Sequence, residues 1–303
     1  MERSLQLLAD DGLAGLVVPK SLTFSGGWGQ IRVRVLPGVT RLVDVGQAFS
    51  GVLLEQVLIA YGHRPTPSVQ AIYAPSTRRI EDNLDKKLWR ELNVWITCFT
   101  PFERRLLDRL SPLPRLGSLS ETGRGLGLQR LAKPRGSVPL YGGTEVGVFE
   151  LLTPRRFLAN GLPPGTERLL RPKVMSQNMV AHIKRPRPHV WIKAAVDWSG
   201  TAIPLDTVNC TTPLQPDEFG LPEIALLLNS KFASWYATKF IFAEAHRTMH
   251  LDADYVGRIP VPQFALPADP SFGIEGSYRN LIRSVTKPDR YPDRSLVDKI
   301  VYL

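Results

Sequence analysis

Residues 11–61 constrain the fold of this chain more than any other segment, because strand-like and helix-like stretches alternate there. The continuous apolar run Leu13–Pro19 is typical of a strand that is buried on both faces of a parallel sheet. A helix-length connection follows, and residues 39–45 and 53–60 then have the composition of two further strands. The stretch GQAFSGV between them is too short for a parallel crossover, so we expect the two strands to be antiparallel.

This segment resembles the closing part of an α/β domain. A doubly wound sheet binds its ligand through a glycine-rich turn in its first strand–helix unit. The first predicted strand begins at Leu13, which leaves no room for such a unit, and we expect this chain to hold only the end of the sheet. Gly26, Gly27 and Gly29 lack the spacing of a dinucleotide-binding loop and indicate a loop and helix entry. The buried face of that helix is predicted to carry Trp28, Ile31, Val35 and Leu36.

The rest of the chain divides at stretches rich in proline and glycine. Residues 62–77 are predicted to be a linker, residues 79–110 to be mostly helical, and residues 111–127 to be a second break. We therefore expect four regions. They are an α/β remnant over 1–61, a linker and helical connection over 62–110, a recognition domain over 111–265, and a tail over 266–303.

Short strand-like pieces dominate the third region. They are predicted over residues 138–141, 146–152, 173–180, 189–193 and 203–208, with Gly, Pro or Asn between them. Residues 221–243 have the clearest helical pattern in the chain, and residues 279–285 predict a short amphipathic segment in the tail.

Charge points to a polyanionic partner. Lys and Arg total 38 against 28 Asp and Glu, which gives a net charge of +10 and a pI near 9.8. A balance of this kind fits nucleic acid. The two cysteines, Cys98 and Cys210, are expected to be reduced and buried, as in a cytoplasmic protein. No apolar run is long enough to cross a membrane, and no metal-ligand spacing is present.

No catalytic constellation is recognisable, but basic and amide side chains gather in the recognition region. Lysine and arginine can neutralise phosphates, and amide, hydroxyl and carboxylate groups can read base edges. The alternative is a solvated loop that Pro186 and Pro188 stiffen. The residues predicted to contact DNA are Thr144, Glu145, Gln177, Asn178, His182, Lys184, Arg185 and Arg187.

Several segments, in this order, resemble TaqI-type adenine-specific DNA methyltransferases, which also occur in fused restriction–modification enzymes. The stretches GLAGLVVPKSL and VDVGQAFSGVLLEQVLIAY resemble the end of the methyltransferase domain of that family. The following stretches resemble its target-recognition domain: LGSLSETGRGLG, VPLYGGTEVGVFEL, RPKVMSQNMVAHIK, AVDWSGTAIPLDTVNCTTP, IALLLNSKFASWY and HLDADYVGRIPVP. The implied fold is the C-terminal strands of an incomplete S-adenosylmethionine-dependent methyltransferase sheet, followed by an α+β target-recognition domain.

The resemblance also implies what this chain lacks. In that family, the cofactor loop and an Asn-Pro-Pro-aromatic tetrapeptide lie before the strand that corresponds to Leu13–Pro19. This sequence contains neither motif. We therefore expect no S-adenosylmethionine binding and no methyl transfer by this chain alone. A separate N-terminal methyltransferase polypeptide would supply both, with double-stranded DNA as substrate. Phe49 matches the position of a family aromatic that stacks on a flipped base, and packing within the turn is the alternative role for it.

Three functional hypotheses remain. The first is a DNA-recognition segment that works with a separate catalytic chain in a restriction–modification or phage-defence system. The second is a non-catalytic specificity module or a truncated methyltransferase remnant. The third is a target-sensing subunit of another phage-defence system. For the first, we expect an unpaired sheet edge and a large apolar face on the isolated chain.

Overall fold

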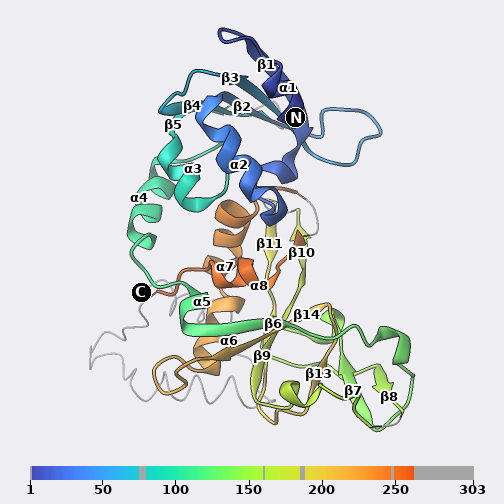
Figure 1. Cartoon of the computed structure of the whole chain (residues 1–303). Coiled ribbons are helices and arrows are strands. Elements are labelled where there is room, and N and C mark those ends of the chain that lie inside the picture. The colour runs from blue at the N-terminus through green and yellow to red at the C-terminus, as the bar shows by residue number, and fades with distance from the viewer. Residues whose placement is uncertain (1, 75–79, 160, 185–187, 247–248, 263–303) are drawn as a thin grey trace, which may run out of the picture. The chain divides into compact units, whose positions relative to one another are not determined.

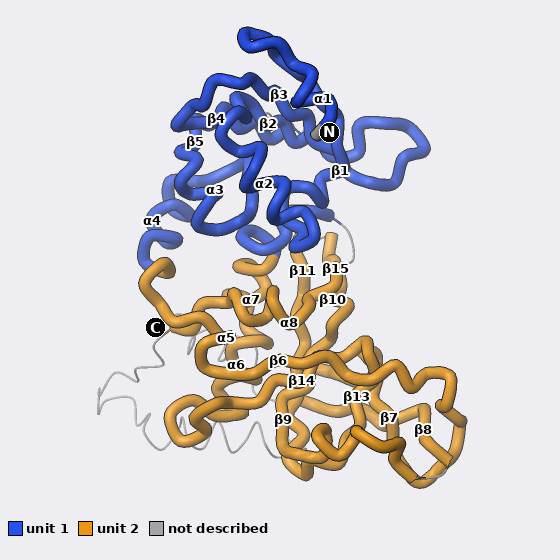
Figure 2. The backbone as a smooth tube through the Cα atoms, in the orientation of Figure 1, with its two compact units in different colours: residues 1–109, 238–247 blue, residues 110–237, 248–303 orange. Residues whose placement is uncertain are grey.

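The structure is a computed structural model, and it describes residues 2–74, 80–159, 161–184, 188–246 and 249–262. The described chain is a mixed α/β protein with several small sheets (Figure 1). It forms two compact units (Figure 2). Unit 1 contains Met1–Arg109 and Thr238–Arg247, and unit 2 contains Leu110–Ala237 and Thr248–Leu303. Unit 1 is therefore built from two stretches of chain that are separated in sequence by most of unit 2.

Unit 1 is organised around one five-stranded sheet in the order β1-β3-β2-β4-β5. The strands are β1 (Leu13–Pro19), β2 (Val39–Gly46), β3 (Gln56–Gly62), β4 (Ser68–Tyr73) and β5 (Ile80–Asp85). Strand β3 is antiparallel to β1 and β2, as predicted for the second pair, and β4 is parallel to β2. Strands β1, β2 and β4 thus run in the same direction, and their carboxyl ends lie at one edge of the sheet.

The strand prediction for Leu13–Pro19 is confirmed, but the prediction that it is buried on both faces is wrong. In the described part of the chain β1 pairs only with β3, so it is an edge strand. Its side chains alternate between exposed and half-buried, and Leu13 and Val17 are 75% and 52% exposed. An apolar run therefore does not mark a central strand here.

Short helices complete unit 1. They are α1 (Glu2–Gln6), α2 (Gly29–Val35), α3 (Lys86–Leu92) and α4 (Pro101–Leu110), with 3-10 turns at Lys20–Thr23, Gly26–Trp28 and Leu36–Gly38. The predicted helix entry after Gly27 is confirmed, and Val35 and Leu36 are buried as expected. Ile31 is half-buried, but Trp28 is exposed because it precedes the first turn of α2 and does not share the helix periodicity.

The linker predicted for residues 62–77 is wrong, because it contains β4. The mostly helical segment predicted for 79–110 begins with another strand, β5. Val69 and Ala71 alternate with more exposed neighbours, and this short period-two pattern lies among prolines and polar residues. The Asp85 side chain accepts a hydrogen bond from the Lys87 amide at 2.7 Å, which ends β5 and begins α3.

Unit 2 contains three small sheets, in the orders β12-β9-β14-β6, β13-β7-β8 and β11-β10-β15. The strands of the first are β6 (Ser120–Arg124), β9 (Lys173–Gln177), β12 (Ala194–Asp197) and β14 (Val208–Pro213). The strands of the second are β7 (Val138–Tyr141), β8 (Arg156–Leu158) and β13 (Ile203–Pro204). The strands of the third are β10 (Met179–Ile183), β11 (His189–Trp191) and β15 (Met249–His250).

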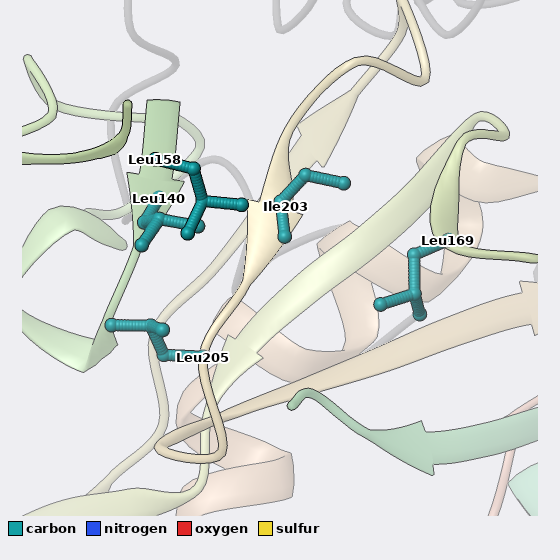
Figure 3. Packing of buried hydrophobic residues seen from close by; sticks show 5 residues of the cluster. All are labelled: Leu140, Leu158, Leu169, Ile203 and Leu205. Carbon is teal, nitrogen blue, oxygen red and sulfur yellow. The ribbon is translucent and has the colours of Figure 1, made fainter. Parts of the chain in front are cut away.

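Two apolar clusters support these sheets. Around β7, β8 and β13, a buried cluster gathers Leu140, Leu158, Leu169, Ile203 and Leu205 (Figure 3). A second cluster contains Val146, Met175, Ala195, Ala202 and Val208. Because each cluster draws on residues far apart in sequence, unit 2 folds through long-range packing more than through local helix formation.

The predicted strands of this region are largely confirmed, with different boundaries. Residues 138–141 form β7, and β11 lies within 189–193. Residues 173–180 divide at Asn178 into β9 and the start of β10, and residues 203–208 divide between β13 and β14. Residues 146–152 form no named strand and contain only the isolated bridge Val146–Leu151.

The long helix predicted over residues 221–243 is interrupted. It consists of α6 (Leu221–Asn229), α7 (Lys231–Tyr236) and a π-helical turn at Ala237–Ile241. Ser230 has an extended backbone and accepts a hydrogen bond from the Ala233 amide at 3.0 Å, so it caps α7. Two further short helices, α5 (Leu116–Leu119) and α8 (Ala253–Gly257), pack against each other.

The predicted tail segment 279–285 lies outside the described residues. Among the helices that the structure describes, none has the length and apolarity to cross a bilayer. The described side chains include no group of three or more His, Cys, Asp or Glu placed to hold a metal ion. Cys98 and Cys210 are both buried and unbonded to each other, as predicted. Burial raises the pKa of the Cys210 thiol to about 12.

Candidate nucleic-acid interface

Phe49 lies in the loop between β2 and β3, at the edge of unit 1 where β1, β2 and β4 have their carboxyl ends. Carboxyl edges of parallel strands are where open α/β sheets bind ligands. Phe49 is 52% exposed, so its ring is not buried by packing within the turn. The loop also exposes Val52, Leu53 and Leu54, and these four residues are named here the apolar loop.

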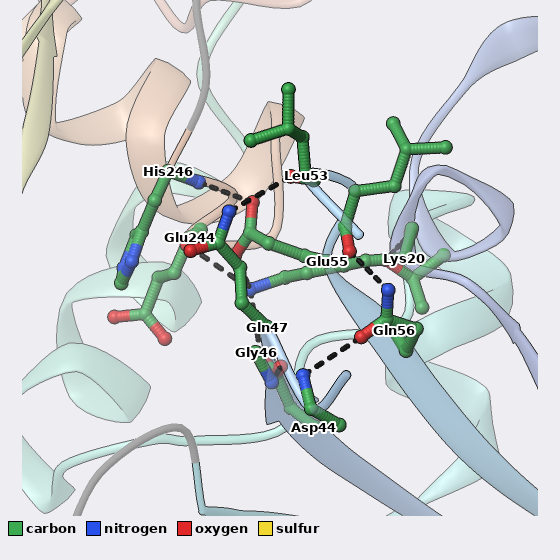
Figure 4. A network of polar contacts seen from close by, with 12 residues as sticks. Lys20, Asp44, Gly46, Gln47, Leu53, Glu55, Gln56, Glu244 and His246 are labelled. Atoms are coloured by element: carbon green, nitrogen blue, oxygen red, sulfur yellow. Dashed lines mark hydrogen bonds and ion pairs between the residues drawn. The ribbon is translucent and has the colours of Figure 1, made fainter. Parts of the chain in front are cut away.

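Hydrogen bonds fix both ends of this loop (Figure 4). At its start, the Gly46 amide donates to Asp44 at 3.1 Å, and the Gln47 side chain donates to the Leu53 carbonyl at 2.9 Å. At its end, the Gln56 side chain accepts from the Ala48 amide at 2.8 Å and donates to the Leu54 carbonyl. The loop is thus ordered at its base while its apolar side chains remain exposed.

Beneath the loop lies a buried ion network centred on Lys20 (Figure 4). The Lys20 ammonium is 2.7 Å from Asp44 Oδ2 and 3.4 Å from Glu55 Oε1, and it donates to the Glu244 carbonyl at 3.1 Å. Glu55 also accepts a hydrogen bond from the His246 amide at 2.6 Å. Charges removed from water need such partners, and here they tie β1, β2, the loop end and residues 238–247 together within unit 1.

Further ionisable groups extend this network. Lys239 is paired with Glu244 at 3.0 Å and Glu103 at 3.3 Å. Burial disfavours the Lys239 ammonium, but Glu244 and Glu103 outweigh that penalty and raise its pKa. Burial, with the negative charges of Glu244 and Asp44, raises the pKa of Tyr73 at the end of β4. The acidic side chains at this edge are therefore already engaged by cations or backbone amides.

In unit 2, the structure corrects the prediction that Glu145 reads bases. Glu145 is buried, and its carboxylate is 2.9 Å from Arg156 and accepts hydrogen bonds from the Gly142 amide and the Thr144 hydroxyl. Burial acts to raise the pKa of this carboxyl, but the hydrogen bonds and Arg156 lower it overall. Glu145 is thus a structural anion that holds the turn before Val146.

Asn178 and Gln177 are likewise structural. Asn178 is fully buried where β9 passes into β10, and its amide donates to Asn209 at 3.2 Å and Asp252 at 3.0 Å. Its oxygen is 2.8 Å from Nδ1 of His250. The half-buried Gln177 donates to the Gly143 carbonyl at 2.7 Å. A polar residue among basic residues is not thereby a base reader, because backbone groups in a crowded loop also need partners.

The remaining predicted contacts lie at the surface or beyond the described residues. Thr144 and Lys184 are exposed, and His182 is half-buried on β10. Arg185 and Arg187 lie outside the described residues. Thr144 lies in the 3-10 turn Gly143–Glu145, which is separate from β10 and β11, so we treat it as a separate candidate DNA contact.

Sequence reasoning missed the Lys20 network and the apolar loop around Phe49. Lys20 follows a Val-Val-Pro strand end, and Glu55 precedes a strand, but no local pattern links them to Glu244. Leu53 and Leu54 were assigned to a strand because they are apolar, whereas β3 begins at Gln56. The signal in the sequence was the consecutive apolar run Val52-Leu53-Leu54, because a strand with one buried face alternates apolar and polar residues.

The solved structures to which this chain is similar include proteins of restriction–modification systems. No family model matches the chain, and no curated protein matches it. The type IIG restriction endonuclease BpuSI matches over 98% of this chain and 45% of its own, at 11% identity and a TM-score of 0.42. The type IIL enzyme MmeI, solved in complex with DNA, matches over 95% and 46%, at 10% identity and a TM-score of 0.45.

A third similar structure is the S subunit of a type I restriction–modification system from M. genitalium. It matches over 66% of this chain and 48% of its own, at 14% identity and a TM-score of 0.29. The chain therefore spans less than half the length of each of these proteins. With TM-scores below 0.5, these likenesses carry no functional argument, and function is argued from the residues of this chain.

Proposed function

We propose that this chain is the DNA-recognition part of an adenine-specific DNA methyltransferase of a restriction–modification or phage-defence system. In this proposal unit 1 is the closing part of the methyltransferase sheet, and unit 2 is the target-recognition domain. The observation that carries the proposal is the anchored loop with an exposed Phe49 at the carboxyl edge of three parallel-running strands. An aromatic ring held there is placed to stack on a base taken out of the duplex.

Methyl transfer is assigned to a separate polypeptide with the cofactor loop and the Asn-Pro-Pro-aromatic tetrapeptide. The described residues do not fit an S-adenosylmethionine site, because at the carboxyl edge the Asp44 and Glu55 carboxylates are engaged by Lys20 and the Glu244 carboxylate is engaged by Lys239. The partner would add its last parallel strand to the unpaired edge of β1. Val17 and Leu58, which face each other across β1 and β3 and are exposed, would lie in that junction.

DNA contact is assigned to the exposed part of the predicted set. Lys184 is exposed and directly follows β10, whereas Arg185 and Arg187, the next cations in the sequence, lie outside the described residues. Lysine and arginine side chains suit the phosphate backbone, and Thr144 and His182 stay in the proposed interface. Glu145, Gln177 and Asn178 support the fold and are not included in the interface.

The test is the salt dependence of DNA binding, measured by fluorescence anisotropy with duplexes of random sequence. Replacing Lys184, Arg185 and Arg187 together by Ala is expected to weaken binding to all sequences. It should also lower the slope of log K against log salt by about one for each phosphate that the variant no longer neutralises. The control is Arg90→Ala, Arg105→Ala and Arg109→Ala, which removes the same charge from α3 and α4. Unchanged binding of the hairpin variant at low salt would remove the hairpin from the interface.

A second candidate is a specificity module that binds DNA without a catalytic partner. One observation favours this second candidate. Within the described residues, the acidic side chains at the carboxyl edge already have cations or backbone amides as partners. The DNA around the gene separates the two candidates. An adjacent reading frame with a glycine-rich loop and an Asn-Pro-Pro-aromatic tetrapeptide, whose product co-purifies with this chain, supports the split enzyme.

A further inference from the structure

A second basic surface lies in unit 2, away from the β10–β11 hairpin in sequence. Residues 122–144 contain no acidic residue and four cations, and residues 151–166 contain no acidic residue and two. The exposed cations of these two stretches are Arg124, Arg130, Lys133, Arg135 and Arg155. The Arg124 side chain donates to the Asp206 carbonyl, and we name the other four residues the β8 cluster. Arg156, the other cation of the second stretch, is paired with Glu145.

The fold brings the two stretches together around β8. The Lys133 amide donates to the Phe157 carbonyl at 2.8 Å, and the Phe157 amide donates to the Lys133 carbonyl at 2.9 Å. The chain then wraps round the end of β8, where the Ser137 amide donates to the Leu158 carbonyl at 3.0 Å, and continues as β7 on the other side. Arg155 immediately precedes β8. Cations from two stretches separated in sequence thus lie on backbone segments next to β8, whose neighbour β7 is labelled beside it in Figure 1.

The sheet β13-β7-β8, which lies beside these cations, is well packed, so it holds their backbone positions in a fixed pattern. The sheet β13-β7-β8 packs over the apolar cluster of Leu140, Leu158 and Ile203 (Figure 3). Gly136 lies against the Leu158 carbonyl so closely that a Cβ there would be 2.2 Å from the oxygen, which fixes the path of the wrapping segment.

Acidic side chains do not neutralise the β8 cluster. The Glu145 carboxylate is taken by Arg156, the Gly142 amide and Thr144. The Asp206 carboxylate accepts a hydrogen bond from the Gln129 side chain. Among the described residues, none forms an ion pair with Arg130, Lys133, Arg135 or Arg155. Uncompensated like charges held close together raise the local potential and attract a polyanion.

We propose that the β8 cluster binds the phosphate backbone of duplex DNA as a second, sequence-independent contact. This inference rests on the proposed DNA-recognition function and deepens it. Arginine and lysine side chains suit phosphate contacts, which position a protein on DNA without carrying sequence information. The β10–β11 hairpin and the β8 cluster then hold the duplex at two places.

The test compares two variants with equal loss of charge. Lys133→Ala, Arg135→Ala and Arg155→Ala are combined in one variant, and Arg90→Ala, Arg105→Ala and Arg109→Ala in the control. Binding to random-sequence duplexes of about 30 base pairs is measured across a salt series. The β8-cluster variant is expected to bind at least about tenfold more weakly near 0.1 M salt, equally for all sequences, with a shallower salt slope. The control should change little.

A charge-preserving variant guards against misfolding. Lys133→Arg, Arg135→Lys and Arg155→Lys keep the charge and should restore most of the affinity, and thermal unfolding checks that every variant is folded. Wild-type protein that binds DNA while the β8-cluster variant binds with unchanged affinity and slope overturns the inference and leaves the proposed function intact. Equal losses in both alanine variants also overturn it, because they indicate net charge alone. Absence of DNA binding by the wild type overturns the proposed function itself.

Discussion

Single side chains in this protein show how a buried amide can replace backbone pairing. The Asn229 amide donates to the Ala194 carbonyl at 2.8 Å and accepts from the Ala194 amide at 3.0 Å. It thus offers β12 the pair of hydrogen bonds that a neighbouring strand would offer. Asn229 also donates to the Ala225 carbonyl, and the neighbouring Ser230 hydroxyl donates to the Leu227 carbonyl. Asn178 is also buried, but its amide is engaged mainly by the side chains of Asn209, Asp252 and His250.

Asn229→Ala is expected to destabilise the protein by about 2–4 kcal/mol, because it leaves the buried Ala194 amide and carbonyl without partners. Urea unfolding followed by tryptophan fluorescence measures this loss. The matched control is Asn83→Ala on β5, where the side chain is more exposed and little change is expected. A loss below about 1 kcal/mol would mean that water or a neighbouring group satisfies Ala194 in place of Asn229.

Phe49 gives the second residue-scale prediction. Stacking of a base on an aromatic ring is worth about 1–3 kcal/mol, or roughly 5- to 150-fold in affinity. The wild type is expected to prefer a duplex with one bulged adenine over the same duplex with an abasic site at that position, and Phe49→Ala should abolish this preference. Phe102→Ala, which removes a ring that is 64% exposed on α4, is the control. A Phe49→Ala protein with the wild-type preference would assign Phe49 another role.

At the scale of elements, the sequence predicts the pairing of strands joined by a short connection. It does not predict strands whose stability depends on partners elsewhere in the sheet. Strands β1 and β2 and the antiparallel β2–β3 pair follow from an apolar run and a short connection. Strands β4 and β5 do not, because their alternation is short and β4 is flanked by prolines. Their stability comes from pairing with β2 and with each other, which a local pattern does not contain.

The candidate site divides in the same way. The exposed aromatic at Phe49 and the basic hairpin at Lys184 could be selected from the sequence, because residue type alone suggests their chemistry. The Lys20 network and the β8 cluster could not, since each depends on residues that only the fold brings together. Lys20 and Glu244 are far apart in the chain, and the Lys133–Phe157 bridge joins two stretches that no periodicity connects.

At the scale of the whole molecule, the edge of β1 that no described strand pairs with predicts self-association. Exposed strand edges with apolar side chains pair with other edges unless a charge or a covering element prevents it. The isolated chain is expected to show concentration-dependent association in sedimentation velocity, and Val17→Lys should reduce it. Val33→Lys, at an exposed valine on α2, is the control. A wild-type protein that stays monomeric at high concentration would indicate that β1 is already covered.

The split of unit 1 into two stretches of chain bears on attempts to exchange sequence specificity between related proteins. Residues 238–247 follow nearly all of the recognition unit, yet Glu244 and His246 complete the network under the Phe49 loop. A transplant of everything after residue 109 would import a foreign copy of this stretch and leave Lys20 and Glu55 with mismatched neighbours. An exchange with two junctions, near residues 110 and 237, would replace only the central part of unit 2. The recipient would then keep its own residues 238–247.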